Sequence, residues 1–195
     1  MLDDFVKHGR LTEQELYHVL RELNRYRSKA RTAGVYSAGD KRIDKDSRDA
    51  VTCWATPIIA PYTFNILQSI VIQHYSHLPL DTTEEAEVQY TSYRVNGHFR
   101  WHQDIMPTTR EDGRARGLTM SINLSESTEY TGGDLLAKLY DDEISLSREK
   151  GSYMIFPSFV RHQACRVDSG RREALVVWTY LTKEEIQWLK NQCVR

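Results

Sequence analysis

The hydrophobic positions in the first part of the chain repeat with the period of an α-helix. Apolar side chains spaced three and four residues apart form one stripe, made of Leu16, Val19, Leu20, Leu23 and Tyr26. Thr12 stands ahead of this stripe with Glu15 three residues later, an arrangement typical of a capping box at a helix start. A second stripe of the same period covers residues 63–75, with Pro61 before it and Pro79 beyond it. The pattern therefore predicts two helices before residue 80.

Elsewhere the pattern favours strands, because short runs rich in β-branched and aromatic residues are bounded by turn residues. Strands are predicted at residues 49–56, 86–93, 99–105, 118–124, 135–139, 143–146, 153–156, 160–167 and 173–181. Asn96-Gly97 predicts a short hairpin, and Gly132-Gly133 and Asp168-Ser169-Gly170 predict turns. The polar segment 107–117 (PTTREDGRARG) is expected to be a mobile loop in the position of a lid.

Two helices followed by about eight short strands indicate a mainly β chain with flanking helices, of the α+β class. We expect one domain over residues 1–195. In it, helices within about 10–80 support one sheet of a double-sheet β-sandwich within about 86–181.

Composition narrows the classes of partner. A formal net charge of −1 gives no general basic surface for nucleic acid, so no nucleic-acid partner is expected. No apolar run approaches the roughly 18 residues that a membrane span needs, so no membrane association is expected. The acidic N-terminus does not resemble a secretory signal, and three cysteines without C-x-x-C spacing favour a reducing compartment. We therefore expect a cytoplasmic protein.

His102, Asp104 and His162 are the candidate metal ligands. Residues two apart on an extended strand face the same side, so His102 and Asp104 are expected to face one cation, and His162 begins a later predicted strand. Two histidines and one carboxylate that leave other positions open are diagnostic of non-haem Fe(II) oxygenases, although zinc uses the same ligand types. An H-x-D pair alone is commonly silent, so the prediction depends on the third ligand. The remaining histidines are expected to be surface or packing residues: His8, His18, His74, His77 and His98.

Arg172 is the candidate anion-binding residue. After the predicted turn at 168–170 the chain is expected to reverse and bring Arg172 nearly level with His162. Its predicted strand face also carries Ala174, Val176 and Trp178, a small or apolar lining in which a cation needs a partner. A guanidinium matches a carboxylate bidentately, so Arg172 is expected to bind an acidic cosubstrate. The alternative is a surface ion pair, which is the expectation for Arg171. Trp54, Trp101 and Trp188 are open between pocket and packing roles.

Taken together, these residues resemble the Fe(II)/2-oxoglutarate-dependent dioxygenases, and most of all the prolyl 4-hydroxylase branch. The resemblance covers about residues 86–181 and is carried by Tyr93–Asp104 (YRVNGHFRWHQD), 132–135 (GGDL), 151–158 (GSYMIFPS), His162, Gly170, Arg172 and Trp178. It implies a double-stranded β-helix (jelly-roll) core, with Fe(II) held by His102, Asp104 and His162. It also implies that Arg172 clamps the distal carboxylate of 2-oxoglutarate and that the phenol of Tyr93 hydrogen-bonds this cosubstrate. Asn123 stands where relatives often carry a larger residue, so the shape of the pocket there is left open.

The resemblance further implies an oxygenase that uses O2, releases succinate and CO2, and takes ascorbate as a candidate reductant. The expected reaction is hydroxylation of an unactivated C–H bond, in a prolyl or other residue of a peptide or protein. A free amino acid or small metabolite is the alternative substrate. A non-enzymatic jelly-roll module that binds metal is the third reading.

Overall fold

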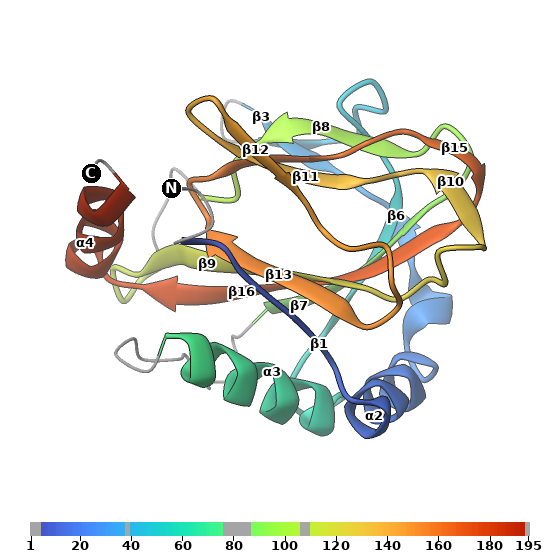
Figure 1. Ribbon diagram of the computed structural model, residues 1–195, viewed down its shortest axis with the longest axis horizontal. Coiled ribbons are helices and arrows are strands. Elements are labelled where there is room, and N and C mark those ends of the chain that lie inside the picture. The colour runs from blue at the N-terminus through green and yellow to red at the C-terminus, as the bar shows by residue number, and fades with distance from the viewer. Residues whose placement is uncertain (1–4, 38–39, 76–86, 106–109, 194–195) are drawn as a thin grey trace.

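The strands form two facing antiparallel sheets in the computed structural model, which describes residues 5–37, 40–75, 87–105 and 110–193 (Figure 1). The larger sheet has seven strands in the order β1-β13-β9-β16-β7-β6-β2. Their bounds are Lys7–Arg10 for β1, Arg31–Thr32 for β2, Val51–Ala55 for β6, Glu87–Tyr93 for β7, Ala115–Asn123 for β9, Ser152–Pro157 for β13 and Arg172–Leu181 for β16. One face of this sheet packs against helices, and the other faces the smaller sheet.

The smaller sheet faces it and has five strands in the order β12-β11-β14-β8-β5. Their bounds are Arg48–Asp49 for β5, His98–His102 for β8, Leu135–Leu139 for β11, Asp142–Ser145 for β12 and Arg161–Ala164 for β14. Two ribbons complete the strands, β3 (Val35–Ser37) with β4 (Asp40–Arg42) and β10 (Tyr130–Gly132) with β15 (Val167–Gly170). The predicted antiparallel double-sheet architecture is thus confirmed.

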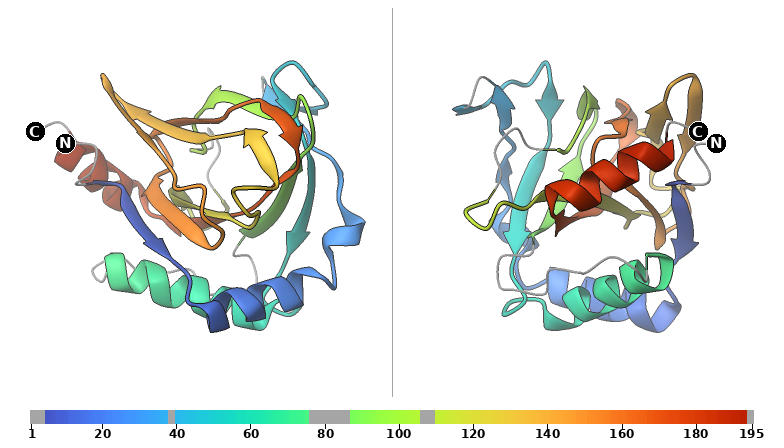
Figure 2. Two further views of the ribbon diagram at one scale, coloured as in Figure 1. Left: turned by 45° about the vertical axis from the view of Figure 1, so that its right-hand side comes forward. Right: turned by 90° about the vertical axis from the view of Figure 1, so that its left-hand side faces the viewer.

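Helices α2 (Glu13–Leu23) and α3 (Pro61–His74) run across the outer face of the larger sheet (Figures 1 and 2). The predicted capping box is present, because the backbone N–H of Thr12 donates to Glu15 at 2.7 Å and that of Glu15 donates to the Thr12 hydroxyl at 3.2 Å. Glu22, buried at the end of α2, accepts from the backbone N–H of Thr63 at 2.8 Å and so caps α3. Both predicted helices are confirmed.

A C-terminal helix, α4 (Lys183–Cys193), was not among the predicted elements. Its signal was available, because Thr182 and Glu185 form a second capping box with backbone-to-side-chain distances of 2.8 and 3.2 Å. Within the described part of the chain, no helix is both long and apolar enough to cross a membrane.

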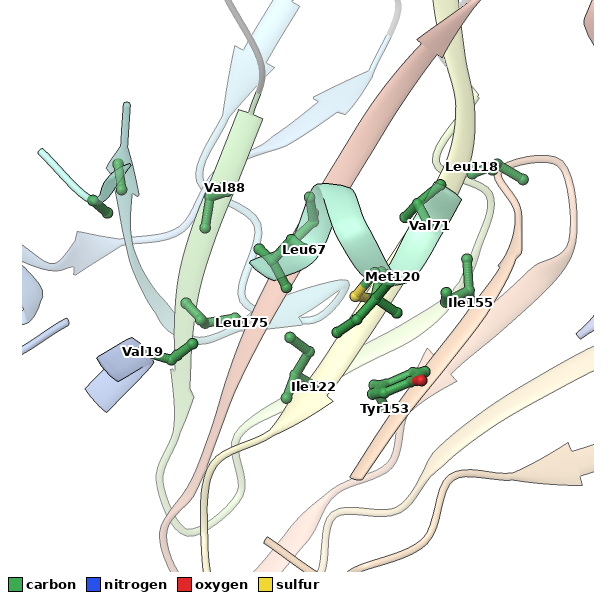
Figure 3. Close-up of a cluster of buried hydrophobic side chains, with 14 of the residues drawn as sticks. Val19, Leu67, Val71, Val88, Leu118, Met120, Ile122, Tyr153, Ile155 and Leu175 are labelled. Carbon is green, nitrogen blue, oxygen red and sulfur yellow. The ribbon is translucent and has the colours of Figure 1, made fainter. Parts of the chain in front are cut away.

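The main hydrophobic core lies between the two helices and the larger sheet, as Figure 3 shows. Its members include Val19 from α2, Leu67 and Val71 from α3, and the outward-facing Val88, Met120, Ile122, Ile155 and Leu175 of the sheet. Each such side chain contributes about 1.5–3 kcal/mol on burial. The core therefore fixes one face of the sheet and leaves the opposite face to the space between the sheets.

Three local predictions were wrong. The Asn96-Gly97 turn forms, but it joins two sheets: β7 pairs with β6 and β16, whereas β8 pairs with β5 and β14. Val167 holds this turn, since its carbonyl accepts from Asn96 at 2.8 Å and its N–H donates to Gly97 at 3.0 Å. Residues 168–170 lie in β15 and pair with β10 in place of forming a turn. Residues 115–117 of the predicted loop belong to β9, while 107–109 lie outside the described residues.

Candidate metal centre and its pocket

His102, Asp104 and His162 lie together, with ligand atoms within 4.8 Å of one another. His102 ends β8 and is directly opposite His162 of β14 in the sheet register. Asp104 follows the end of β8, where its backbone N–H donates to Ser158 at 2.9 Å. The structure brings the three predicted residues together, but by a partly different route from the one expected. Strand β8 ends at His102, and Asp104 lies beyond it, where its backbone bonds to the segment that follows β13.

Both histidine rings are held in one orientation by their own strands. The Nδ1 atom of His102 lies 2.7 Å from the carbonyl oxygen of Arg100, and that of His162 lies 3.0 Å from the carbonyl oxygen of Val160. A carbonyl only accepts, so each Nδ1 carries a proton, and in the neutral ring each Nε2 then presents a lone pair. The Nε2 atoms of His102 and His162 lie 3.6 and 3.3 Å from carboxylate oxygens of Asp104.

Electrostatics within the trio shift the pKa values of the two imidazoles in opposite directions. Burial, together with the neighbouring His162, lowers the pKa of His102 to about 3. Burial would also lower the pKa of His162, but the charge and hydrogen bond of Asp104 outweigh it and raise that pKa. Burial would raise the pKa of Asp104, yet the His162 charge holds it below its ordinary value. The carboxylate is therefore ionised and His102 is neutral at physiological pH, as metal ligands must be.

Thr119 and two aromatic rings contact the trio and also line the cavity. The Thr119 hydroxyl on β9 donates to Asp104 at 2.9 Å. Phe99 stacks on His102 with ring centroids 3.4 Å apart, and Phe156 lies 4.7 Å from the His162 ring. Sequence reasoning missed Thr119, although its alternation with the buried Leu118 and Met120 placed it on the inner face of the strand.

Arg172 lines the same cavity, which has a volume of about 710 Å³. It is only 3% exposed, and among the described residues no carboxylate lies within ion-pair distance of it. It reaches the cavity from the larger sheet, where it is opposite Tyr93, so the expected reversal that set it level with His162 on a neighbouring strand was wrong. Ala174, Val176 and Trp178 line the cavity beside it, as their shared strand face predicted.

Tyr93 and Gly133 define the space around Arg172. The Tyr93 ring centroid lies 5.8 Å from the guanidinium carbon, and the ring is buried at the cavity wall. Gly133 has a φ of +70°, and a Cβ there would lie 2.9 Å from Val167 and 3.3 Å from the Arg172 side chain. Glycine therefore suits both the backbone conformation and the close passage of Arg172.

The other predicted candidates fall into two groups. Trp54 and Trp101 line the cavity, whereas Asn123 does not and donates to the carbonyls of Ser125 and Arg148 at 2.9 and 2.7 Å. Several histidines have packing or backbone partners: His18 stacks on Tyr62, His74 contacts the Tyr153 hydroxyl, and both ring nitrogens of His98 contact backbone carbonyls. His77 lies outside the described residues. Over the described ranges, His102, Asp104 and His162 form the cluster able to hold a metal ion.

Comparisons with known proteins agree with this geometry. The family model of the 2OG-Fe(II) oxygenase superfamily matches residues 88–180. A PKHD-type hydroxylase of Synechococcus sp. (strain CC9311) is 26% identical over 150 residues, which are 75% of this chain. The chain spans 63% of the length of that relative.

Solved structures share the fold at low sequence identity. A prolyl-4-hydroxylase of Pseudomonas putida has a TM-score of 0.70 and 19% identity, covering 90% of this chain and 92% of that one. A prolyl hydroxylase from Trichoplax adhaerens, solved with a peptide fragment of the hypoxia inducible factor oxygen degradation domain, has a TM-score of 0.68 and 15% identity, covering 95% and 87%. These likenesses support the jelly-roll arrangement of the two sheets.

Proposed function

We propose that this chain is an Fe(II)- and 2-oxoglutarate-dependent dioxygenase that hydroxylates an unactivated C–H bond. The match of the 2OG-Fe(II) oxygenase superfamily model to residues 88–180 and the likeness to a PKHD-type hydroxylase support this proposal. The observation that carries the proposal is the preformed cluster of two imidazoles and one carboxylate at the wall of a cavity. That donor set suits Fe(II) and leaves coordination positions free on the cavity side.

The residues fit the cosubstrate as well as the metal. Arg172 is a buried cation with no anionic partner among the described residues, and an unpaired buried charge is strongly disfavoured. A carboxylate at this position would offset that cost through a charge-assisted, bidentate pair. We propose that Arg172 binds the distal carboxylate of 2-oxoglutarate and that the Tyr93 phenol donates to the same molecule.

The protein's own part in the reaction is to orient and to exclude water. When bound, Fe(II) and 2-oxoglutarate supply the chemistry by which O2 oxidises a C–H bond to an alcohol, with succinate and CO2 released. His102, Asp104 and His162 would hold the metal at the wall of the cavity, which a substrate can enter. Phe99 and Phe156 pack against the ligand rings and keep water from their outer faces.

We propose a prolyl or other residue of a peptide or protein as the substrate. Support comes from the prolyl hydroxylases of the same fold, one of them solved with a peptide. A free amino acid or small metabolite is the second candidate, because a cavity of about 710 Å³ falls within the range of small-molecule pockets.

Cytoplasmic location is proposed on the three free cysteines, and ascorbate is the proposed reductant. The balanced net charge of −1 supports the absence of nucleic-acid partners.

Anaerobic titration tests the proposal. Fe(II) and 2-oxoglutarate added together should produce a visible metal-to-ligand charge-transfer band, and O2 should then yield succinate. His102→Ala and His162→Ala should abolish both signals, whereas His98→Ala should keep them, because His98 contacts only backbone oxygens among the described residues. A band that survives in either ligand variant would show that the metal is held elsewhere.

A further inference from the structure

A second arginine, Arg48, stands in the cavity on the side of the smaller sheet. It lies on β5 opposite Phe99 and lines the same cavity as the metal trio. Its Nη2 donates to the side-chain oxygen of Gln89 at 2.6 Å, on strand β7 of the larger sheet. The side chain therefore bridges the two sheets and fixes the guanidinium within the cavity.

Arg48, like Arg172, has no acidic partner among the described residues, whereas two other arginines that line the cavity have one. Arg116 pairs with Glu87 at 2.6 Å, and Arg42 pairs with Asp44 at 3.5 Å. For Arg48 no carboxylate of the described residues comes within ion-pair distance, and its buried Nε has no acceptor there. The single hydrogen bond to Gln89 is a bond to a neutral group and leaves the charge uncompensated.

The guanidinium is one aromatic ring away from the metal ligands. The Arg48 Cζ lies 4.6 Å from the Phe99 ring centroid, and Phe99 stacks on His102 at 3.4 Å. A group bound by Arg48 therefore sits beside the place where the proposed reaction occurs.

Charge balance identifies the kind of group that fits. In the loaded site of the proposed function, the charges of Fe(II), Asp104, both carboxylates of 2-oxoglutarate and Arg172 cancel. Arg48 then remains as an unmatched cation in a cavity that a substrate would close off from water. Desolvation of such a charge is costly unless an anion accompanies it.

We propose that Arg48 binds a carboxylate of the prime substrate, so that the enzyme acts on acidic substrates. This inference rests on the proposed function and narrows its substrate class. The carboxylate belongs either to an Asp or Glu beside the oxidised residue of a peptide or to the free end of a small molecule. In both cases the oxidised carbon lies close to the carboxylate, because Arg48 is separated from His102 by one ring.

Binding of matched probes tests the inference without turnover. Protein loaded anaerobically with Fe(II) and saturating 2-oxoglutarate is titrated with N-acetylproline and with N-acetylprolinamide. A second arm compares acetyl-Pro-Glu-amide with acetyl-Pro-Gln-amide. Quenching of tryptophan fluorescence reports binding, because Trp54, Trp101 and Trp178 line the cavity. The carboxylate member of at least one pair should bind at least about tenfold more tightly, and the pair that discriminates reveals the source of the carboxylate.

Variants assign the preference to Arg48. Arg48→Gln should bring the ratio of dissociation constants near one, and Arg48→Met, which keeps the packing on Phe99, should do the same if the first variant folds poorly. Arg48→Lys should retain part of the preference. Arg42→Gln is the matched control, since it removes one positive charge from an exposed, paired arginine of the cavity rim and should leave the ratio unchanged.

The outcomes separate this inference from the proposed function. Equal binding of both members in both pairs, with the charge-transfer band intact, would overturn the role of Arg48 alone. The same holds if Arg48→Gln keeps the preference, or if it weakens 2-oxoglutarate in place of the probe. An absent band in the unaltered protein would overturn both proposals.

Discussion

The two faces of the larger sheet are made by the same strands and serve opposite purposes. On β16, Leu175 and Val177 point into the core against the helices, while Ala174 and Val176, which alternate with them, line the cavity. The same alternation on β7 and β9 places Gln89, Thr119 and Ser121 inward. Because side chains of a strand alternate, a single pattern supplies both stability and the site. Substitutions at neighbouring residues of one strand can therefore test stability and ligand binding separately.

The largest expected effect is on the core face. Leu175→Ala should lower the free energy of unfolding by about 2–5 kcal/mol, because the side chain is fully buried and leaves a cavity. Affinity for 2-oxoglutarate should change little below the unfolding transition. Urea unfolding and cosubstrate titration measure the two effects. Val176→Ala is the control, and an equal loss of stability there would break the distinction between the faces.

Arg172→Leu should weaken cosubstrate binding without lowering stability, the reverse of Leu175→Ala. Loss of a desolvated, charge-assisted pair should weaken 2-oxoglutarate by about tenfold to several hundredfold, with metal affinity nearly unchanged. Stability should not fall, since an unpaired buried charge is removed. Arg171→Leu changes the exposed neighbour and should leave cosubstrate affinity intact. If both variants weakened it equally, net charge and not the Arg172 position would be responsible.

A smaller effect is expected for Thr119→Val. The change keeps the shape of the side chain and removes its hydrogen bond to Asp104, so metal affinity should fall by about tenfold. Competition with a chelator under anaerobic conditions measures it. Ser121→Ala, two residues along the same inner face, should have no such effect. Equal affinity in the Thr119 variant would mean that Asp104 is oriented by its backbone alone.

The dependence of metal binding on pH should match the Thr119→Val effect for each pH unit of acidification. Asp104 raises the pKa of His162, so below that pKa the metal must displace one proton from His162. His102, with a pKa of about 3, is already neutral and releases none. Metal affinity should therefore fall by about tenfold per pH unit on acidification below the His162 pKa. A slope of two protons would show that both histidines are protonated in the metal-free protein.

The sequence predicted local structure and the grouping of these side chains better than strand pairing. Helix α2, its capping box and the proximity of His102, Asp104 and His162 followed from spacing and residue chemistry. The position of Arg172 did not follow from the sequence. The turn expected at 168–170 is a strand, and Arg172 lies opposite Tyr93 in the larger sheet. Strand pairing joins residues far apart in the chain, and no local pattern specifies it.

Arg48 shows the same limit at the site. It sits on a two-residue strand, and nothing near it in the sequence marks it as part of a pocket. Its proximity to His102 arises because β5 pairs with β8, and its bridge to Gln89 arises because the two sheets face each other. Residues of this kind become visible only when the sheets are assembled.

The rings of His102 and His162 are oriented by carbonyls two residues earlier in the chain, at Arg100 and Val160. Because main-chain oxygens make these contacts, the side chains of Arg100 and Val160 do not orient the imidazoles. Substitution of the exposed Arg100 can therefore leave the orientation and tautomer of His102 unchanged. The centre is thereby insulated from much of the substitution that reshapes the rest of the molecule.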